Sequence, residues 1–246
     1  MKGKYKMNPR LINLDSPTHH LGRGNRRRGF SLIELLVVIS IIGLLASLTI
    51  GLMGVASRKN KESQLKADLN KYVTAIDNYK ASLGSYPPDN PGNPAISQLF
   101  YELSGTIFAN AQFAIPGRQT GITVQNVKQV FGRDGFANSS RDPKELKVTE
   151  SFKATQVREV SVKSVNVELL VVPVKGPAQS SYHGINFPLA VKARDGSLIN
   201  PWLYDSSSTN RNNPNGFDLW AEVVIGKNII RFSNWEKEPV VVGPAP

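Results

Sequence analysis

The sequence predicts an α+β fold in which one long N-terminal helix packs on a C-terminal antiparallel β-sheet. An apolar run covers residues 30–56, and residues 57–83 continue it with a single apolar stripe at helical spacing. Later runs rich in Val, Ile and aromatic residues are bounded by Gly, Pro or Asn, as strands are. Across its 246 residues the chain has no cysteine, which excludes disulfides, thiolate metal sites and cysteine catalysis.

The basic charge is concentrated at the N-terminus. Of the formal net charge of +11, residues 1–29 carry +7, and the rest of the chain is mildly basic. Lys and Arg in the middle of the chain are mixed with acids and show no aromatic stacking pattern, so we expect no nucleic-acid partner. We interpret residues 1–29 as a leader peptide, whose removal takes most of the basic excess with it.

The apolar segment 30–56 has the length of a membrane span. Residues 35–56 form an uncharged stretch of 22 residues, and about 20 are needed to cross a bilayer core. A buried core helix is rarely so long and so uniformly apolar. A cleavable secretory signal has a shorter apolar region and a small-residue cleavage site, which is missing before Arg58. Arg26, Arg27 and Arg28 predict a cytoplasmic N-terminus and an outward-facing C-terminal domain, held by one span.

Glu34 is the single charged residue in 30–56. A carboxylate deep in lipid costs roughly 2.5–3.5 kcal/mol, and less near the interface. One interpretation places Glu34 among the lipid headgroups. The other pairs it with a cation that exists after assembly, and a cut between Gly29 and Phe30 creates one, the α-amine of Phe30 on a neighbouring subunit.

The residues from Arg28 to Ile39, RGFSLIELLVVI, resemble the class III signal of type IV pilins and type II secretion pseudopilins. The resemblance implies that a prepilin peptidase cuts after Gly29 and methylates the new Phe30 amine. It also implies that Glu34 sets subunit register in a helical homo-oligomeric fibre. The implied partners are the inner-membrane assembly platform, minor pseudopilins and membrane lipid.

Residues 57–84 predict an amphipathic continuation of the same helix. Leu65, Leu69, Tyr72, Ile76, Tyr79 and Leu83 follow a 4,3,4,3,4 spacing. Gly84 suits the position after the helix, and Pro87 and Pro88 prevent continuation. We therefore expect one helix from Phe30 to Leu83. The stripe is also compatible with a coiled-coil seam, but a globular domain follows at once, which favours packing on that domain.

Residues 85–246 predict a globular α+β head. A short helix is expected at 96–103, a mixed polar loop at 109–143, a hairpin turn at Asp195-Gly196 and an exposed loop at 205–215. The expected strands are 157–162, 165–174, 187–192, 217–225 and 229–232.

The head extends the resemblance to major pseudopilins of type II secretion and departs from it at one point. The matching residues are Gly84-Ser85-Tyr86-Pro87, Pro201-Trp202, Tyr204, Phe217-Asp218-Leu219-Trp220 and Asn234-Trp235. The family holds calcium with several aspartates between the last two of these motifs. Here Asn200 and Ala221 replace an aspartate and a serine, and residues 221–233 contain no aspartate. Asp218, with Glu222, is the remaining candidate calcium ligand. Residues 95–186 match nothing in the simplest relatives and are interpreted as an insertion.

No enzyme is predicted. His183 is the single histidine after the leader, and its neighbours Ser180 and Ser181 are too close in sequence to propose a triad. Neither a P-loop nor a GxGxxG motif is present. The leading hypothesis is therefore a fibre subunit in the inner membrane, with a periplasmic head and without a cofactor other than the calcium considered above. A non-polymerising single-span protein with an outward binding domain is the alternative, and a tethered hydrolase comes third. The C-terminal motifs favour a secretion pseudopilin over a surface pilin.

Overall fold

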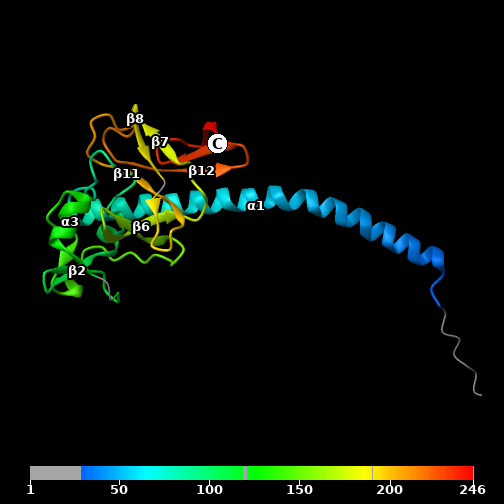
Figure 1. Cartoon of the computed structure of the whole chain (residues 1–246), viewed down its shortest axis with the longest axis horizontal. Coiled ribbons are helices and arrows are strands. Elements are labelled where there is room, and N and C mark those ends of the chain that lie inside the picture. The colour runs from blue at the N-terminus through cyan, green and yellow to red at the C-terminus, as the bar shows by residue number, and fades with distance from the viewer. Residues whose placement is uncertain (1–28, 119–120, 190, 246) are drawn as a thin grey trace, which may run out of the picture. The chain divides into compact units, whose positions relative to one another are not determined.

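The computed structural model describes residues 29–118, 121–189 and 191–245, apart from the side chains of 48–55. It divides the chain into two compact units, Met1–Gly51 and Leu52–Pro246. Helix α1, Leu32–Leu83, contributes residues to both units (Figure 1). Its bounds confirm the predicted helix to within two residues. The two units are described separately below.

In the first unit, α1 presents apolar side chains to solvent on all sides. Phe30, Leu32, Ile33 and their neighbours as far as Leu45 are between 46% and 82% exposed. The hydroxyls of Ser40 and Ser47 donate to the carbonyls of Leu36 and Leu44, at 2.7 Å each, so their polarity is satisfied within the helix. The sequence predicts a membrane span at 30–56. Among the described residues, no helix combines the length and apolarity that crossing a membrane requires.

In the second unit, one stripe of α1 lies in the core. Its members are Leu65, Leu69, Tyr72, Ala75, Ile76 and Tyr79, each at most 7% exposed. Tyr72 meets the ring of Trp202 edge-on at 5.4 Å between centroids. Gly84 has φ +85° and donates its amide to the Lys80 carbonyl at 2.8 Å, which ends the helix as predicted. The stripe therefore packs on the head.

In the described residues after α1 there are two short helices and a single 3-10 turn. They are α2 (Leu99–Ser104), α3 (Val124–Phe131) and η1 (Pro143–Glu145). The strands of the first half of the head are β1 (Thr106–Ala109), β2 (Gln112–Ala114), β3 (Gly121–Thr123), β4 (Ser139–Ser140), β5 (Val157–Val162) and β6 (Val165–Val172). Those of the second half are β7 (Gln179–Tyr182), β8 (Ile185–Pro188), β9 (Val191–Lys192), β10 (Leu198–Pro201), β11 (Leu203–Asp205), β12 (Asp218–Ile225), β13 (Asn228–Ser233) and β14 (Val240–Pro244).

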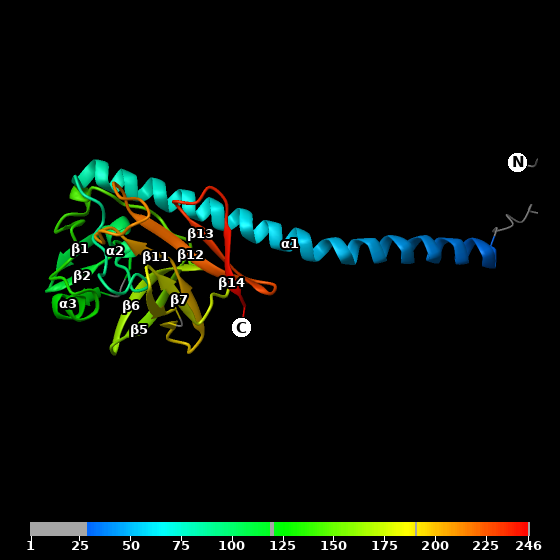
Figure 2. The same cartoon turned by 90° about the horizontal axis from the view of Figure 1, so that it is seen from above.

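The C-terminal sheet has the antiparallel order β11-β12-β13-β14. Figure 2 shows β12 and β13 running beside the second half of α1. Leu219, Ala221 and Val223 alternate along β12 and are fully buried in the same core as the α1 stripe. The expected pairing of helix and antiparallel sheet is thus confirmed.

The middle of the head contains two further sheets and a hairpin, with orders β5-β6-β10-β9, β3-β2-β1-β4 and β7-β8. The loop expected at 109–143 is wrong, because this stretch contains β2, β3, α3 and β4. β2, β3 and β4 have two or three residues each, too few to give periodicity. α3 does carry Val124, Val127, Val130 and Phe131 at helical spacing, a signal that sequence reasoning missed. The strand expected at 187–192 is interrupted, since β8 ends at Pro188 and β9 starts at Val191. One pair, β1 with β4, is parallel.

Candidate functional site

The amino end of α1 is closed by a reciprocal pair of hydrogen bonds. The Ser31 amide donates to Oε2 of Glu34 at 2.8 Å, and the Glu34 amide donates to the Ser31 hydroxyl at 3.2 Å. This arrangement is a capping box, which satisfies two amides that a helix start leaves without partners. It holds the Glu34 carboxylate at the amide of Ser31, the residue that follows Phe30 in the chain.

The predicted processing residues lie at this end of the helix, and their roles stay predictions. Gly29 has open space around it, and Phe30 is 81% exposed. Within the described residues, no ion pair reaches Glu34. Among the described residues, the Ser31 amide is the donor that contacts the Glu34 carboxylate, and it does so at Oε2.

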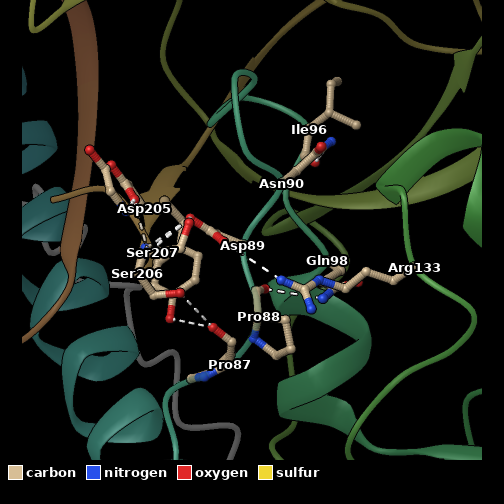
Figure 3. Close-up of polar contacts among 12 residues, drawn as sticks. Pro87, Pro88, Asp89, Asn90, Ile96, Gln98, Arg133, Asp205, Ser206 and Ser207 are labelled. Atoms are coloured by element: carbon tan, nitrogen blue, oxygen red, sulfur yellow. Dashed lines mark hydrogen bonds and ion pairs between the residues drawn. The ribbon is translucent and has the colours of Figure 1, made fainter.

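A second polar feature lies where the chain leaves α1. Asp89 is 2% exposed, and its Oδ2 accepts from the amides of Ser206 and Ser207 at 3.2 and 3.1 Å and from the Ser207 hydroxyl at 2.8 Å (Figure 3). Oδ1 of Asp205 accepts from the same Ser207 amide at 3.1 Å and from the Ser208 amide at 2.9 Å. The two carboxylates therefore converge on one amide. This corrects the expectation of an exposed loop at 205–215 for Asp205, which is 5% exposed and ends β11.

Little positive charge compensates this carboxylate pair. Nη2 of Arg133 lies 4.0 Å from Oδ1 of Asp89, beyond hydrogen-bonding distance. Burial, together with the neighbouring Asp89 carboxylate, raises the pKa of Asp205. A cavity of about 180 Å³ borders the pair and is also lined by Tyr182, His183 and Phe187.

A third buried carboxylate ties the head to α1. Glu102 of α2 is fully buried and accepts from the Tyr79 hydroxyl at 2.8 Å and from the amides of Ala137 and Asn138 at 2.9 Å. Burial is the largest influence on this carboxyl and raises its pKa. Since its partners come from α1 and from the segment after α3, Glu102 joins the middle of the head to the helix.

Asp218 does not have the surroundings of a calcium ligand. It is fully buried, and Oδ2 accepts from the Tyr182 hydroxyl and from the backbone and side-chain nitrogens of Asn212, at 2.7, 2.7 and 2.8 Å. Oδ1 accepts from the Asn213 amide at 2.9 Å. Three donors thus converge on Oδ2 and one reaches Oδ1, so protein groups already compensate most of the charge of this buried carboxylate. Glu222, the other expected calcium ligand, forms an ion pair with Arg231 at 2.7 Å. Calcium does not fit this donor set, because it requires six to eight free oxygens.

His183 lies in the turn between β7 and β8. It has φ 50°, followed by Gly184 at φ 79°, which is the geometry of a type I′ hairpin turn. Its ring meets that of Tyr182 at 4.2 Å between centroids. In the part of the chain that is described, no group of three or more His, Asp or Glu side chains is placed to hold a metal ion.

Sequence reasoning missed the Asp89–Asp205 pair and the contact of Tyr182 with Asp218. Asp205 is followed by Ser206, Ser207 and Ser208, and an Asp before serines is a known signal for a turn in which the carboxylate accepts from following amides. No comparable local signal links Tyr182 to Asp218, because 36 residues separate them.

Comparison with known proteins agrees with the N-terminal motif. Residues 24–55 match the family model described as the prokaryotic N-terminal methylation motif. This match includes Gly29, Phe30 and Glu34. No solved structure matches the chain.

The chain is similar to type II secretion system core protein G from several bacteria. The one from Pectobacterium carotovorum is 45% identical over 76 residues, which is 30% of this chain and 44% of that protein. The protein from Escherichia coli K12 is 41% identical over 69 residues, 28% and 47% of the two chains. The protein from Pseudomonas aeruginosa is 32% identical over 71 residues, which is 29% of this chain and 50% of that protein. The chain thus spans about half the length of these relatives, and the resemblance expected from the sequence is confirmed over that part.

Proposed function

We propose that this chain is a structural subunit of a type II secretion pseudopilus or a related fibre. In this proposal a prepilin peptidase removes residues 1–29, and the mature chain polymerises through α1. The head lies in the periplasm, and the apolar segment 30–56 of α1 lies in the inner membrane before assembly. The family match at 24–55 and the similarity to core protein G support it.

The observation that carries the proposal is the exposure of the apolar side chains in residues 30–45. Large apolar side chains are exposed around the whole circumference of α1, whereas an ordinary surface helix exposes a polar face. Such a surface requires a cover, either lipid or other apolar helices. A fibre supplies the second kind of cover, because identical helices stack when subunits associate head to tail without closing a ring.

Glu34 gives this stacking a specific register. It is the one acidic group in an apolar surface, and the capping box holds its carboxylate at the helix start. Cleavage after Gly29 creates a positive amine on Phe30. An intersubunit pair between that amine and Glu34 brings the helices together at one axial offset, since any other offset leaves a carboxylate unpaired among apolar side chains.

The experiment compares Glu34→Ala with wild type in cells that supply the prepilin peptidase and the assembly platform. We expect Glu34→Ala to be cleaved like wild type and to form no fibres, as judged by shearing or crosslinking between subunits. Glu62→Ala is the matched control. Glu62 is also a carboxylate on α1, but it pairs with Arg58 at 2.8 Å outside the apolar segment, so fibres should form normally.

The same experiment separates the alternative of a non-polymerising membrane protein. That alternative predicts a monomer before and after processing, with and without the Glu34 carboxylate. Fibres of normal yield from Glu34→Ala would contradict the register argument. The absence of any fibres from the processed wild-type chain would contradict the proposed function.

A further inference from the structure

The carboxylate of Asp218 stands at the start of β12, just before the segment 221–233 in which the family resemblance implies a calcium loop. Four hydrogen bonds of 2.7–2.9 Å surround it, from a hydroxyl, two backbone amides and a side-chain amide. Three of these donors come from Asn212 and Asn213, a few residues before β12. The fourth comes from Tyr182, on a separate hairpin.

The β7–β8 hairpin is fixed against the C-terminal sheet by more than this hydrogen bond. The Tyr182 ring stacks on Trp220 at 4.4 Å with an interplanar angle of 21°. Phe187, Leu189 and Trp220 share a small buried cluster with Ala95 and Leu203. Apolar packing sets the position of the hairpin. The same packing therefore holds the Tyr182 hydroxyl where it can donate to the Asp218 carboxylate.

The segment where a calcium loop is implied has a different structure here. β12 and β13 pair continuously from Trp220↔Ser233 to Ile225↔Asn228, so only Gly226 and Lys227 form the turn. Gly226 has φ +64°, as a tight turn requires. Glu222 within this hairpin receives two hydrogen bonds from Arg231, at 3.0 and 2.7 Å. The hairpin thus has neither a loop that can wrap an ion nor a carboxylate without a partner.

We propose that the β7–β8 hairpin replaces a metal ion at Asp218, so that the head folds and keeps its C-terminal sheet without calcium. A buried carboxylate is stable only when charges or hydrogen-bond donors compensate for its lost hydration. Protein donors do this here: Tyr182 closes the site from the side of the hairpin, and Asn212 and Asn213 close it from the preceding loop. Tyr182 and most of the hairpin lie within residues 95–186, the region that the sequence indicated as an insertion, which gives this insertion a structural role.

The first test measures the thermal unfolding of the full chain in detergent, in EGTA and in about 10 mM CaCl2, with MgCl2 at equal ionic strength as the control. This concentration is roughly ten times the weakest dissociation constants of extracellular calcium modules. A site of that affinity would raise the Tm by roughly 3–6 °C. We expect the Tm in EGTA and in calcium to agree to within about 1 °C. A rise specific to calcium would overturn the proposal.

The second test compares Tyr182→Phe with Tyr86→Phe in EGTA. Tyr182→Phe keeps the ring on Trp220 and removes one donor from Asp218, so we expect a Tm lower by roughly 3–10 °C. Tyr86 also packs beside this region, with its ring 5.1 Å from that of Phe217, but its hydroxyl makes none of the described hydrogen bonds. Its variant should unfold like wild type. Equal effects of the two substitutions would contradict a role for the Tyr182 hydroxyl.

Discussion

Ser31 and Glu34 cap each other across the first turn of α1: the Ser31 amide donates to the Glu34 carboxylate, and the Ser31 hydroxyl accepts from the Glu34 amide. The residue proposed to pair subunits therefore also has a local role in its own chain. The local contact is made at Oε2. The cap orients Glu34 before a neighbouring Phe30 amine arrives.

Substituting Ser31 tests whether this cap matters. Ser31→Ala removes the acceptor for the Glu34 amide, and loss of such a cap costs about 0.5–2 kcal/mol. We expect hydrogen exchange of the first-turn amides to become roughly 2- to 30-fold faster in detergent. Ser31→Thr keeps the hydroxyl and should exchange like wild type. Equal exchange in all three proteins would show that the capping box does not hold the helix start.

A second prediction concerns the bond between Tyr79 and Glu102. Tyr79→Phe removes a 2.8 Å hydrogen bond to a fully buried carboxylate. We expect a loss of about 1.5–3 kcal/mol in the free energy of unfolding, because the remaining carboxylate keeps two amide donors but loses its link to α1. Urea unfolding of the full chain in detergent measures it.

Tyr72→Phe is the control for this prediction. Tyr72 lies two turns earlier on the same buried stripe, and its hydroxyl accepts or donates none of the described hydrogen bonds. Removing this buried hydroxyl should therefore not lower the free energy of unfolding. If Tyr72→Phe destabilised the protein as much as Tyr79→Phe, the effect would belong to the ring packing and not to Glu102.

The Asp89–Asp205 pair predicts an unusual dependence of stability on pH. The pKa of Asp205 is raised in the folded protein, chiefly by burial. The folded state therefore favours the protonated carboxyl, and its contribution to stability is complete below the unfolded pKa of about 3.9. This contribution is lost as the pH rises through the higher folded pKa.

Asp205→Asn mimics the protonated carboxyl at every pH. Its side-chain oxygen keeps the acceptor for the Ser207 and Ser208 amides, and its nitrogen supplies a donor. We expect the Tm of the variant relative to wild type to increase from acid to neutral pH. Asp77→Asn, at an exposed carboxylate on α1, should show no such trend. A difference that is constant with pH would contradict the shared burial of the two carboxylates.

The sequence predicted the long helix and its buried stripe because the 4,3 spacing from Leu65 to Tyr79 repeats over many residues. The C-terminal strands were predicted from runs rich in Val, Ile and aromatic residues, since β12 is buried on both faces from Asp218 to Val223 and shows no alternation. The shortest strands gave no comparable signal. β2 and β3 have three residues each, and their place depends on pairing with each other and with β1.

The candidate sites also divide into those with a local sequence signal and those formed by distant segments. Glu34 was recognisable from sequence because it interrupts an apolar run, and its partner Ser31 is three residues away. The Asp89–Asp205 pair and the contact of Tyr182 with Asp218 join distant segments through tertiary packing. The expected calcium ligand Asp218 was a candidate because of its motif. Three of its hydrogen-bond donors come from Asn212 and Asn213, and the fourth, Tyr182, comes from a hairpin without a motif of its own.

The central claim is that the chain is cut after Gly29 and assembles with Phe30 as its first residue. Mass spectrometry of the N-terminal peptide, from the protein produced together with a prepilin peptidase, tests it most directly. The account predicts a peptide that begins at Phe30 and carries one methyl group on its amine. A mature chain that retains residues before Phe30 while the peptidase is active would contradict the account.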